Sequence, residues 1–233
     1  MFKLDSPLMN ILNKVADIMI LNLMVILFSL PIFTAGAAIT AGYSVAFKMA
    51  KNEESYIIRG FWKAFKENFK QSTAIWLIFV AIFAVLFLDY RIMFYSEMEM
   101  GRWITYGVIA VTVIISLGFS FAFPLQARFV NKVKNTFKNS FLMALSHLPS
   151  AILFVISYAI PVLLVYFFPQ TIPIVFLSAC GLLIYLKSFL FLKIFKKYEP
   201  DTEENGQEEE SGEGIFAVSE AMEKMSENNK KNK

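Results

Sequence analysis

Five stretches of the chain are apolar over a length that can cross a lipid bilayer, and no other feature constrains the fold as much. A hydrocarbon core about 30 Å thick requires roughly 20 mostly apolar residues in a helix. Lipid admits only helices and closed barrels, because every backbone polar group must be paired within the protein. We expect spans at about residues 15–34, 73–89, 103–123, 150–168 and 172–192. The sequence therefore predicts an all-α, helical integral membrane protein with about five transmembrane helices.

The rest of the chain is too short for a soluble catalytic domain. Of its 233 residues, 1–197 form the expected five-span membrane domain. Residues 198–233 are rich in Glu, and their composition predicts a disordered, acidic cytoplasmic tail. The net charge of +3 is too small to indicate a nucleic-acid partner. The lipid bilayer is thus the first partner that the sequence predicts.

The first apolar stretch, residues 18–33, has two interpretations. The small residues at 34–38 that follow it resemble the cleavage site of a signal peptide. However, Asp5 and Asp17 precede the stretch, and more positive charge follows it than precedes it, which is the wrong asymmetry for a signal peptide. We therefore favour a retained first span, which Pro31 is expected to kink or end.

The distribution of Lys and Arg between the spans predicts the orientation. Residues 48–70 carry six such residues, residues 128–138 carry four and residues 193–197 carry three, whereas residues 89–102 carry two. Loops rich in Lys and Arg stay in the cytoplasm, so five spans place the N-terminus outside and the C-terminus in the cytoplasm. The segment 35–50 is short for a crossing and is expected to lie at the interface or re-enter the membrane. If it crossed fully, there would be six spans and a cytoplasmic N-terminus.

Both cytoplasmic loops are expected to form amphipathic helices at the membrane surface. Large aromatic residues recur on one face of each helix, while Lys residues occupy other faces. The aromatic residues are Phe61, Phe65 and Phe69 in the first loop and Phe129, Phe137 and Phe141 in the second. We treat these six as a candidate face for a partner or for the membrane surface. The alternative is that the two helices connect spans and pack on the underside of the bundle.

A few polar residues lie at membrane depth. Asp17 and Asn22, in or near the first span, are the candidate functional polar positions, since a carboxylate or amide in lipid is costly. Asp17 is close enough to the edge of the span to face headgroups, and Asn22 is expected to bond to another helix. Lys187, near the cytoplasmic end of the last span, is expected to extend its ammonium to the surface.

No constellation of catalytic or metal-binding residues is recognisable. His147 is the only histidine and Cys180 the only cysteine, so one chain contains neither a multi-histidine site nor an intrachain disulfide. The sequence also lacks the HExxH, GxSxG and GxxxxGK[ST] motifs. We therefore expect a protein that is not an enzyme, without catalytic, metal or cofactor-binding residues.

Several motifs resemble the YesL family of bacterial membrane proteins, whose biochemical function is unassigned. In the first 75 residues these are Leu4-Asp5-Ser6-Pro7-Leu8, Asp17 with Leu21-Asn22, Leu30-Pro31-x-x-Thr34-x-Gly36, Ala41-Gly42-Tyr43 and Phe61-x-x-Ala64-Phe65-Lys66-x-Asn68-Phe69. The middle of the chain is similar at Pro124-Leu125-x-Ala127-Arg128-Phe129 and Phe137-Lys138-Asn139-Ser140-Phe141. The resemblance covers roughly residues 2–195 and leaves out the acidic tail. It implies a bacterial plasma membrane and genes located beside carbohydrate transporters and polysaccharide-degrading enzymes.

These observations favour a non-enzymatic accessory or regulatory membrane protein linked to carbohydrate uptake and utilisation. A carbohydrate transporter subunit is the partner that the resemblance implies, and the oligomeric state stays open. The alternative is a small permease that acts as an oligomer and uses a polar cavity around Asp17 and Asn22. A membrane-embedded enzyme is the least favoured interpretation, because the chain lacks suitable residues.

Overall fold

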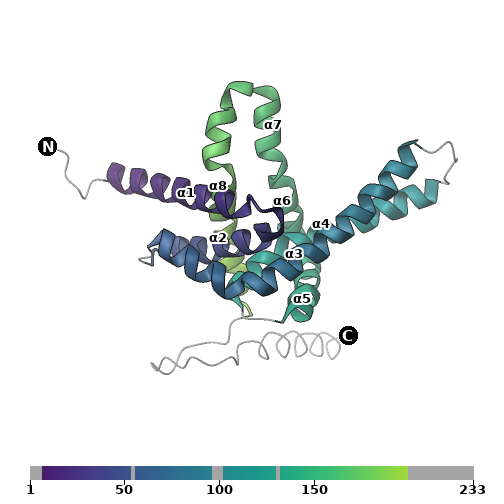
Figure 1. Cartoon of the computed structure of the whole chain (residues 1–233), viewed down its shortest axis with the longest axis horizontal. Helices are drawn as coiled ribbons and strands as arrows, with labels where there is room; N and C mark the ends of the chain where they lie inside the picture. The colour runs from purple at the N-terminus through teal and green to yellow at the C-terminus, as the bar shows by residue number, and fades with distance from the viewer. Residues whose placement is uncertain (1–6, 54–55, 96–101, 130–131, 199–233) are drawn as a thin grey trace.

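The computed structural model describes residues 7–53, 56–95, 102–129 and 132–198, and this part of the chain is helical without β-strands (Figure 1). The α-helices are α1 (Pro7–Ser29), α2 (Ala35–Ala50), α3 (Ile57–Tyr95), α4 (Arg102–Arg128), α5 (Val133–Ser146), α6 (Leu148–Ser157), α7 (Ala159–Phe167) and α8 (Ile172–Phe195). Two short 3₁₀ helices, η1 (Ile32–Thr34) and η2 (Pro169–Thr171), precede α2 and α8. The acidic tail predicted at 198–233 lies, from residue 199 onward, outside the described residues.

Five helical stretches within the described residues are long and apolar enough to cross a membrane. They are Ile11–Ser29, Ile57–Tyr95, Trp103–Arg128, Leu148–Phe167 and Pro169–Phe195. The prediction of an all-α, multi-pass membrane protein is therefore confirmed. Most of each apolar segment is not buried inside the protein. The buried share is largest in α4, at 44%, and smallest in α6–α7, at 11%. These faces are suited to contact with lipid.

The first span ends where the sequence predicts. Pro31 follows α1 in an extended conformation and begins the short helix η1. The hydroxyl of Thr34 donates to the carbonyl oxygens of Phe28 at 2.6 Å and Pro31 at 2.7 Å. Because a proline removes a backbone donor, these side-chain bonds satisfy carbonyls that the helix end leaves free. The chain then reverses direction into α2.

Helix α2 lies at the centre of the protein, where α1, α3, α4 and α8 contact it. Twelve of its 16 residues are buried. Small residues permit this, since a Cβ at Gly36 would approach the Ser72 carbonyl oxygen to 2.6 Å. The sequence predicts an interfacial or a re-entrant position for this segment, and burial among four helices is compatible with the re-entrant one.

Helices α1 and α2 form a hairpin whose open end is fixed by Lys14. Its ammonium donates to the Met49 carbonyl oxygen at 2.8 Å and to the Asn52 side-chain oxygen at 3.3 Å. The early part of α1 therefore lies beside the end of α2. The ends of the two helices that lie away from their connecting turn are therefore held together.

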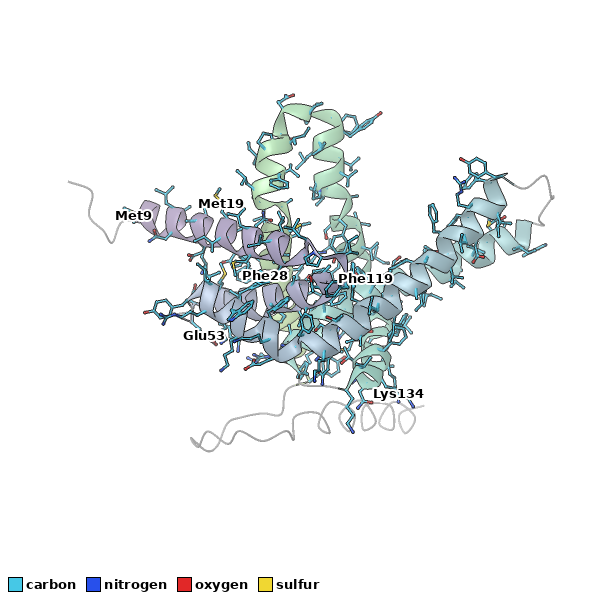
Figure 2. All side chains as sticks on the ribbon, viewed as in Figure 1. Met9, Met19, Phe28, Glu53, Phe119 and Lys134 are labelled. Carbon is cyan, nitrogen blue, oxygen red and sulfur yellow. The ribbon has the colours of Figure 1, made fainter. Side chains whose placement is uncertain are left out.

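The long hairpin of α3 and α4 projects away from this centre (Figure 1). Helix α3 runs without interruption for 39 residues, so the expected amphipathic helix and the second span are one continuous element. Nothing breaks the helix, because its range contains no proline and Gly60 lies near its start. Phe28 and Phe119 lie where the hairpins meet, whereas Met9 lies toward the free end of α1 (Figure 2).

The third hairpin consists of α6 and α7 on one side and α8 on the other (Figure 1). The span predicted at 150–168 is not one helix but two, which meet at Tyr158. Pro161 explains the break, since it lacks an N–H and its ring conflicts with the carbonyl of residue 157. Helix α7 contains no buried residue.

Candidate functional site: a buried lysine at the break in the fourth span

Asn22 is fully buried between α1 and α8 and is completely paired there. Its amide nitrogen donates to the Phe176 carbonyl oxygen at 2.9 Å. Its side-chain oxygen accepts the backbone N–H of Gly181, also at 2.9 Å. The prediction of a bond to another helix is confirmed, and the bonds assign Asn22 to helix packing.

Asp17 is half-buried and faces a different part of the protein. It lines an open pocket of about 590 Å³ together with Tyr56 and Arg59 at the start of α3. Five residues along a helix correspond to a rotation of about 140°, so Asp17 and Asn22 point to different neighbours. The pocket that Asp17 lines is not lined by Asn22, so this pocket does not join the two residues that the permease alternative places around one cavity.

The aromatic faces predicted for a partner or the membrane surface point into the protein instead. Phe61 and Phe65 belong to the buried core, and Phe69, Phe129, Phe137 and Phe141 are partly buried against it. The ring centroids of Phe28 and Phe65 are 5.0 Å apart, and those of Phe79 and Phe137 are 5.2 Å apart. The six residues thus pack within the bundle, as the alternative from the sequence predicts, because helical periodicity identifies an apolar face but not what covers it.

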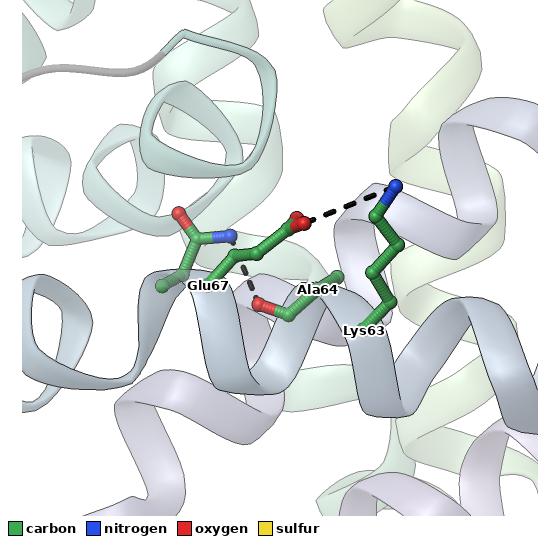
Figure 3. A network of polar contacts seen from close by, with 4 residues as sticks. Lys63, Ala64 and Glu67 are labelled. Carbon is green, nitrogen blue, oxygen red and sulfur yellow. Dashed lines mark hydrogen bonds and ion pairs between the residues drawn. The ribbon is translucent and has the colours of Figure 1, made fainter.

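The opposite face of α3 is the exposed one. Lys63 and Glu67 form an ion pair at 3.9 Å, with side chains 78% and 58% exposed, next to the bond from Asn68 to the Ala64 carbonyl oxygen (Figure 3). An exposed pair of this kind contributes little to stability, on the order of 0.3–0.5 kcal/mol. This polar face therefore lies toward the outside of the bundle.

Lys187 does not reach the surface, contrary to the expectation from the sequence. The residue is 4% exposed, and its ammonium donates to the Phe154 carbonyl oxygen at 3.0 Å. The ammonium also lies 3.3 Å from the centroid of the Tyr158 ring. Its stem points inward from α8 to the junction of α6 and α7, so the amine lies in the interior of the protein.

The break at Pro161 explains why a lysine can be buried there. The N–H of Tyr158 bonds to Val155 at 3.2 Å rather than continuing the regular helical pattern to Phe154. The Phe154 carbonyl oxygen instead accepts the hydroxyl of Ser157 at 2.7 Å and the ammonium of Lys187. Because the C-terminal end of a helix carries partial negative charge, the end of α6 favours a cation.

A small cavity of about 130 Å³ adjoins the lysine. It is lined by Val25, Ile39, Tyr43, Tyr158, Cys180, Leu183, Ile184 and Lys187. Tyr43 is buried, and both Tyr43 and Tyr158 line the cavity. Helices α1, α2 and α8 and the junction of α6 and α7 thus each contribute to one cluster with an amine and two phenols.

A second polar cluster joins α3, α4 and α5. The amide nitrogen of Gln126 donates to the side-chain oxygen of Gln71 at 2.6 Å, and its oxygen accepts the hydroxyl of Thr136 at 2.7 Å. Gln126 is 2% exposed. Gln126 is not among the residues predicted from the sequence, although a glutamine two positions after Pro124 in an apolar helix is a signal. Its bonds fasten α5 to the bundle, which is a structural role.

Comparison with known proteins gives one family. The family model described as "Protein of unknown function, DUF624" matches residues 18–90, which comprise most of α1, all of α2 and most of α3. No curated protein and no solved structure matches the chain. The match includes Val25, Ile39 and Tyr43 of the cavity and excludes Lys187.

Within the described residues, no group of three His, Cys, Asp or Glu side chains could hold a metal ion.

Proposed function

We propose that the chain is a YesL-type, non-enzymatic accessory or regulatory protein of the bacterial plasma membrane, linked to carbohydrate uptake and utilisation. The resemblance in the first 75 residues supports this proposal, and the match over residues 18–90 agrees with it at the level of the wider family. Association with a carbohydrate transporter subunit would occur laterally, within the membrane. The carrying observation is the large unburied apolar surface, above all on α6–α7, where 11% of the span is buried.

The cavity supports an accessory role over a sugar-binding one. Ligand sites for small molecules have volumes of about 300–1,000 Å³, whereas the cavity beside Lys187 measures about 130 Å³. The apolar side chains of α7 point outward, with Val162 67% exposed and Tyr166 77% exposed. A transmembrane partner can pack on such a surface without any polar recognition.

Co-purification from native membranes tests this proposal. The tagged full-length chain should enrich a carbohydrate transporter subunit. Deletion of the gene for this chain, with the transporter present, should impair growth on a particular sugar. Val162→Trp on α7 should reduce the recovery of that subunit, whereas Val113→Trp on α4, where the native residue is 51% exposed, should not. The proposal fails if no transporter subunit is enriched with the wild-type chain.

We also propose that the N-terminus and the segment around Lys51 share the cytoplasmic side with residues 193–197. The bonds from Lys14 to Met49 and Asn52 support this orientation. A reporter that is active only outside the cell should be inactive when fused before residue 1 or after Asn52 and active when fused after Tyr95. Reporter activity at the N-terminal fusion would contradict this orientation and would support five spans with an external N-terminus.

A small permease that acts as an oligomer is the second candidate. The observation that favours it is the broken fourth span with Lys187 at the break, because discontinuous membrane helices often mark substrate or ion sites. Purified protein in liposomes would then catalyse solute uptake that Lys187→Met abolishes. An accessory protein would show no uptake without its transporter.

A further inference from the structure

Lys187 is a cation enclosed among the spans without an anion beside it. In the described part of the chain, ion pairs within 4.0 Å join Lys51 to Glu53 and Lys63 to Glu67, and none involves Lys187. Its neighbours, the Phe154 carbonyl oxygen and the Tyr158 ring, offer partial negative charge only. Removing a charge from water without a counter-charge is energetically costly. An anionic ligand would offset that penalty.

The adjoining cavity opens to the outer surface of the spans. Cys180 is exposed and Tyr158 is 42% exposed, although both line the cavity with the buried Lys187. The remaining walls are apolar, formed by Val25 and Ile184 among others. A ligand would therefore enter from the side that faces lipid and meet the ammonium at the inner end.

We propose that this cavity binds the carboxylate of a single-chain amphiphile, such as a fatty acid. The carboxylate would pair with the ammonium of Lys187, and its monovalent charge would match the single cation. At about 130 Å³ the cavity holds the head and only the first methylene groups of the chain. The rest of the chain would lie on the exposed apolar surface outside the mouth, where Leu177 is 37% exposed and Ile160 is 51% exposed. This proposal is independent of the accessory function.

The single cysteine provides a test in the wild-type protein. The full-length chain is placed in phosphatidylcholine nanodiscs, and the rate at which N-ethylmaleimide modifies Cys180 is followed by intact mass. Oleate should slow the reaction about tenfold at saturation, a change equivalent to about 1.4 kcal/mol. Methyl oleate has the same chain without the charge and should leave the rate nearly unchanged. Acetate should also have little effect, since it lacks the chain.

Variants then assign the effect to the lysine. Lys187→Met should remove the protection by oleate, while Lys193→Met, which replaces an exposed lysine on the same helix, should retain it. Equal protection by oleate and methyl oleate in the wild-type chain would overturn the proposal, and this comparison holds even if Lys187→Met fails to fold. Absence of modification would show a closed mouth and would also overturn it. If acetate protected Cys180 as well as oleate does, the ligand would be a small water-soluble carboxylate, and the proposal of an amphiphile would be overturned.

Discussion

Asn22 and Lys187 are both polar residues buried among apolar helices, yet their surroundings differ. Asn22 has its amide donor and acceptor bonded to the backbone of α8. Lys187 has one hydrogen bond and a ring contact but no counter-charge among the described residues. The difference teaches that polarity at membrane depth is not enough to mark a functional site. A group whose donor and acceptor are both bonded fixes the position of helices, whereas a lysine without a counter-charge is a candidate for a functional site.

The largest expected effect concerns the helix contact that Asn22 maintains. A Cβ at Gly181 would lie 2.6 Å from the Ile18 carbonyl oxygen and 2.9 Å from the Asn22 Cβ. Since backbone cannot yield easily, Gly181→Ala should separate α1 from α8 and lower stability by about 3 kcal/mol. The melting temperature of the detergent-solubilised protein measures this loss.

The control for that change is Gly107→Ala on α4. A Cβ there has no neighbour within 4 Å. Alanine is a better helix former than glycine by about 1 kcal/mol, so this variant should be as stable as the wild type or more stable. If Gly181→Ala melts at the same temperature as Gly107→Ala, then α1 and α8 do not approach each other as closely as the structure shows.

The second prediction removes the paired amide itself. Asn22→Leu leaves the Gly181 N–H and the Phe176 carbonyl oxygen without their side-chain partner. An orphaned buried backbone group is costly, so stability should fall by about 2 kcal/mol, while protection of Cys180 by oleate should persist in the folded fraction. Asn13→Leu, on an exposed position of the same helix, is the matched control. Loss of oleate protection without loss of stability would assign Asn22 to the ligand site instead.

Lys187→Met should have a smaller effect on stability and a larger one on binding. The Phe154 carbonyl oxygen keeps the Ser157 hydroxyl as a donor when the lysine is removed. Replacing a buried charge by an apolar side chain of similar length is often neutral, so we expect a change below about 1 kcal/mol in either direction. Thermal unfolding without added amphiphile measures it. A loss as large as that of Asn22→Leu would show that Lys187 holds the helices together and would remove the contrast.

The sequence predicted which segments are long and apolar enough to cross a membrane, but not how they meet. Length and apolarity are properties of each segment alone, and for that reason the five spans and the end of α1 at Pro31 could be predicted. The central position of α2 depends on four neighbouring helices, which no local pattern reveals. The break at Tyr158 was predictable in principle, since Pro161 lies within the apolar stretch. Its importance arises only because Lys187 lies beside it in space.

The candidate site shows the same limit. The partner of Asn22 was predicted as a class, another helix, because an amide in an apolar helix must be paired. The aromatic faces could not be assigned from the sequence, since Phe61 and Phe65 meet protein where the pattern allowed lipid or a partner equally well. Lys187 was assigned to the surface because a long side chain near a helix end usually extends outward. Only the packing of α6 against α8 shows that it points inward.

The smallest expected effect tests a third polar contact, which lies beyond the spans. The His147 imidazole and the Tyr198 hydroxyl are 3.0 Å apart and join the start of α6 to the segment after α8. Burial lowers the pKa of His147 from its usual 6.5, and the nearby Lys197 lowers it further. The native state thus resists protonation more than the unfolded chain does. Stability should be complete above pH 6.5 and should fall as the pH drops below that value through the lowered pKa.

Melting temperatures of the full-length chain between about pH 8 and pH 5 measure this dependence. His147→Gln should flatten it, because the titrating group is gone while a hydrogen bond to Tyr198 remains possible. Lys197→Met should make it shallower, since removing the nearby positive charge moves the pKa of His147 back toward its usual value. Lys196→Met, an exposed neighbour, should leave the profile unchanged. A profile in which His147→Gln retains the full decline would assign the pH dependence to other groups, and His147 would then join Asn22 as a purely structural contact.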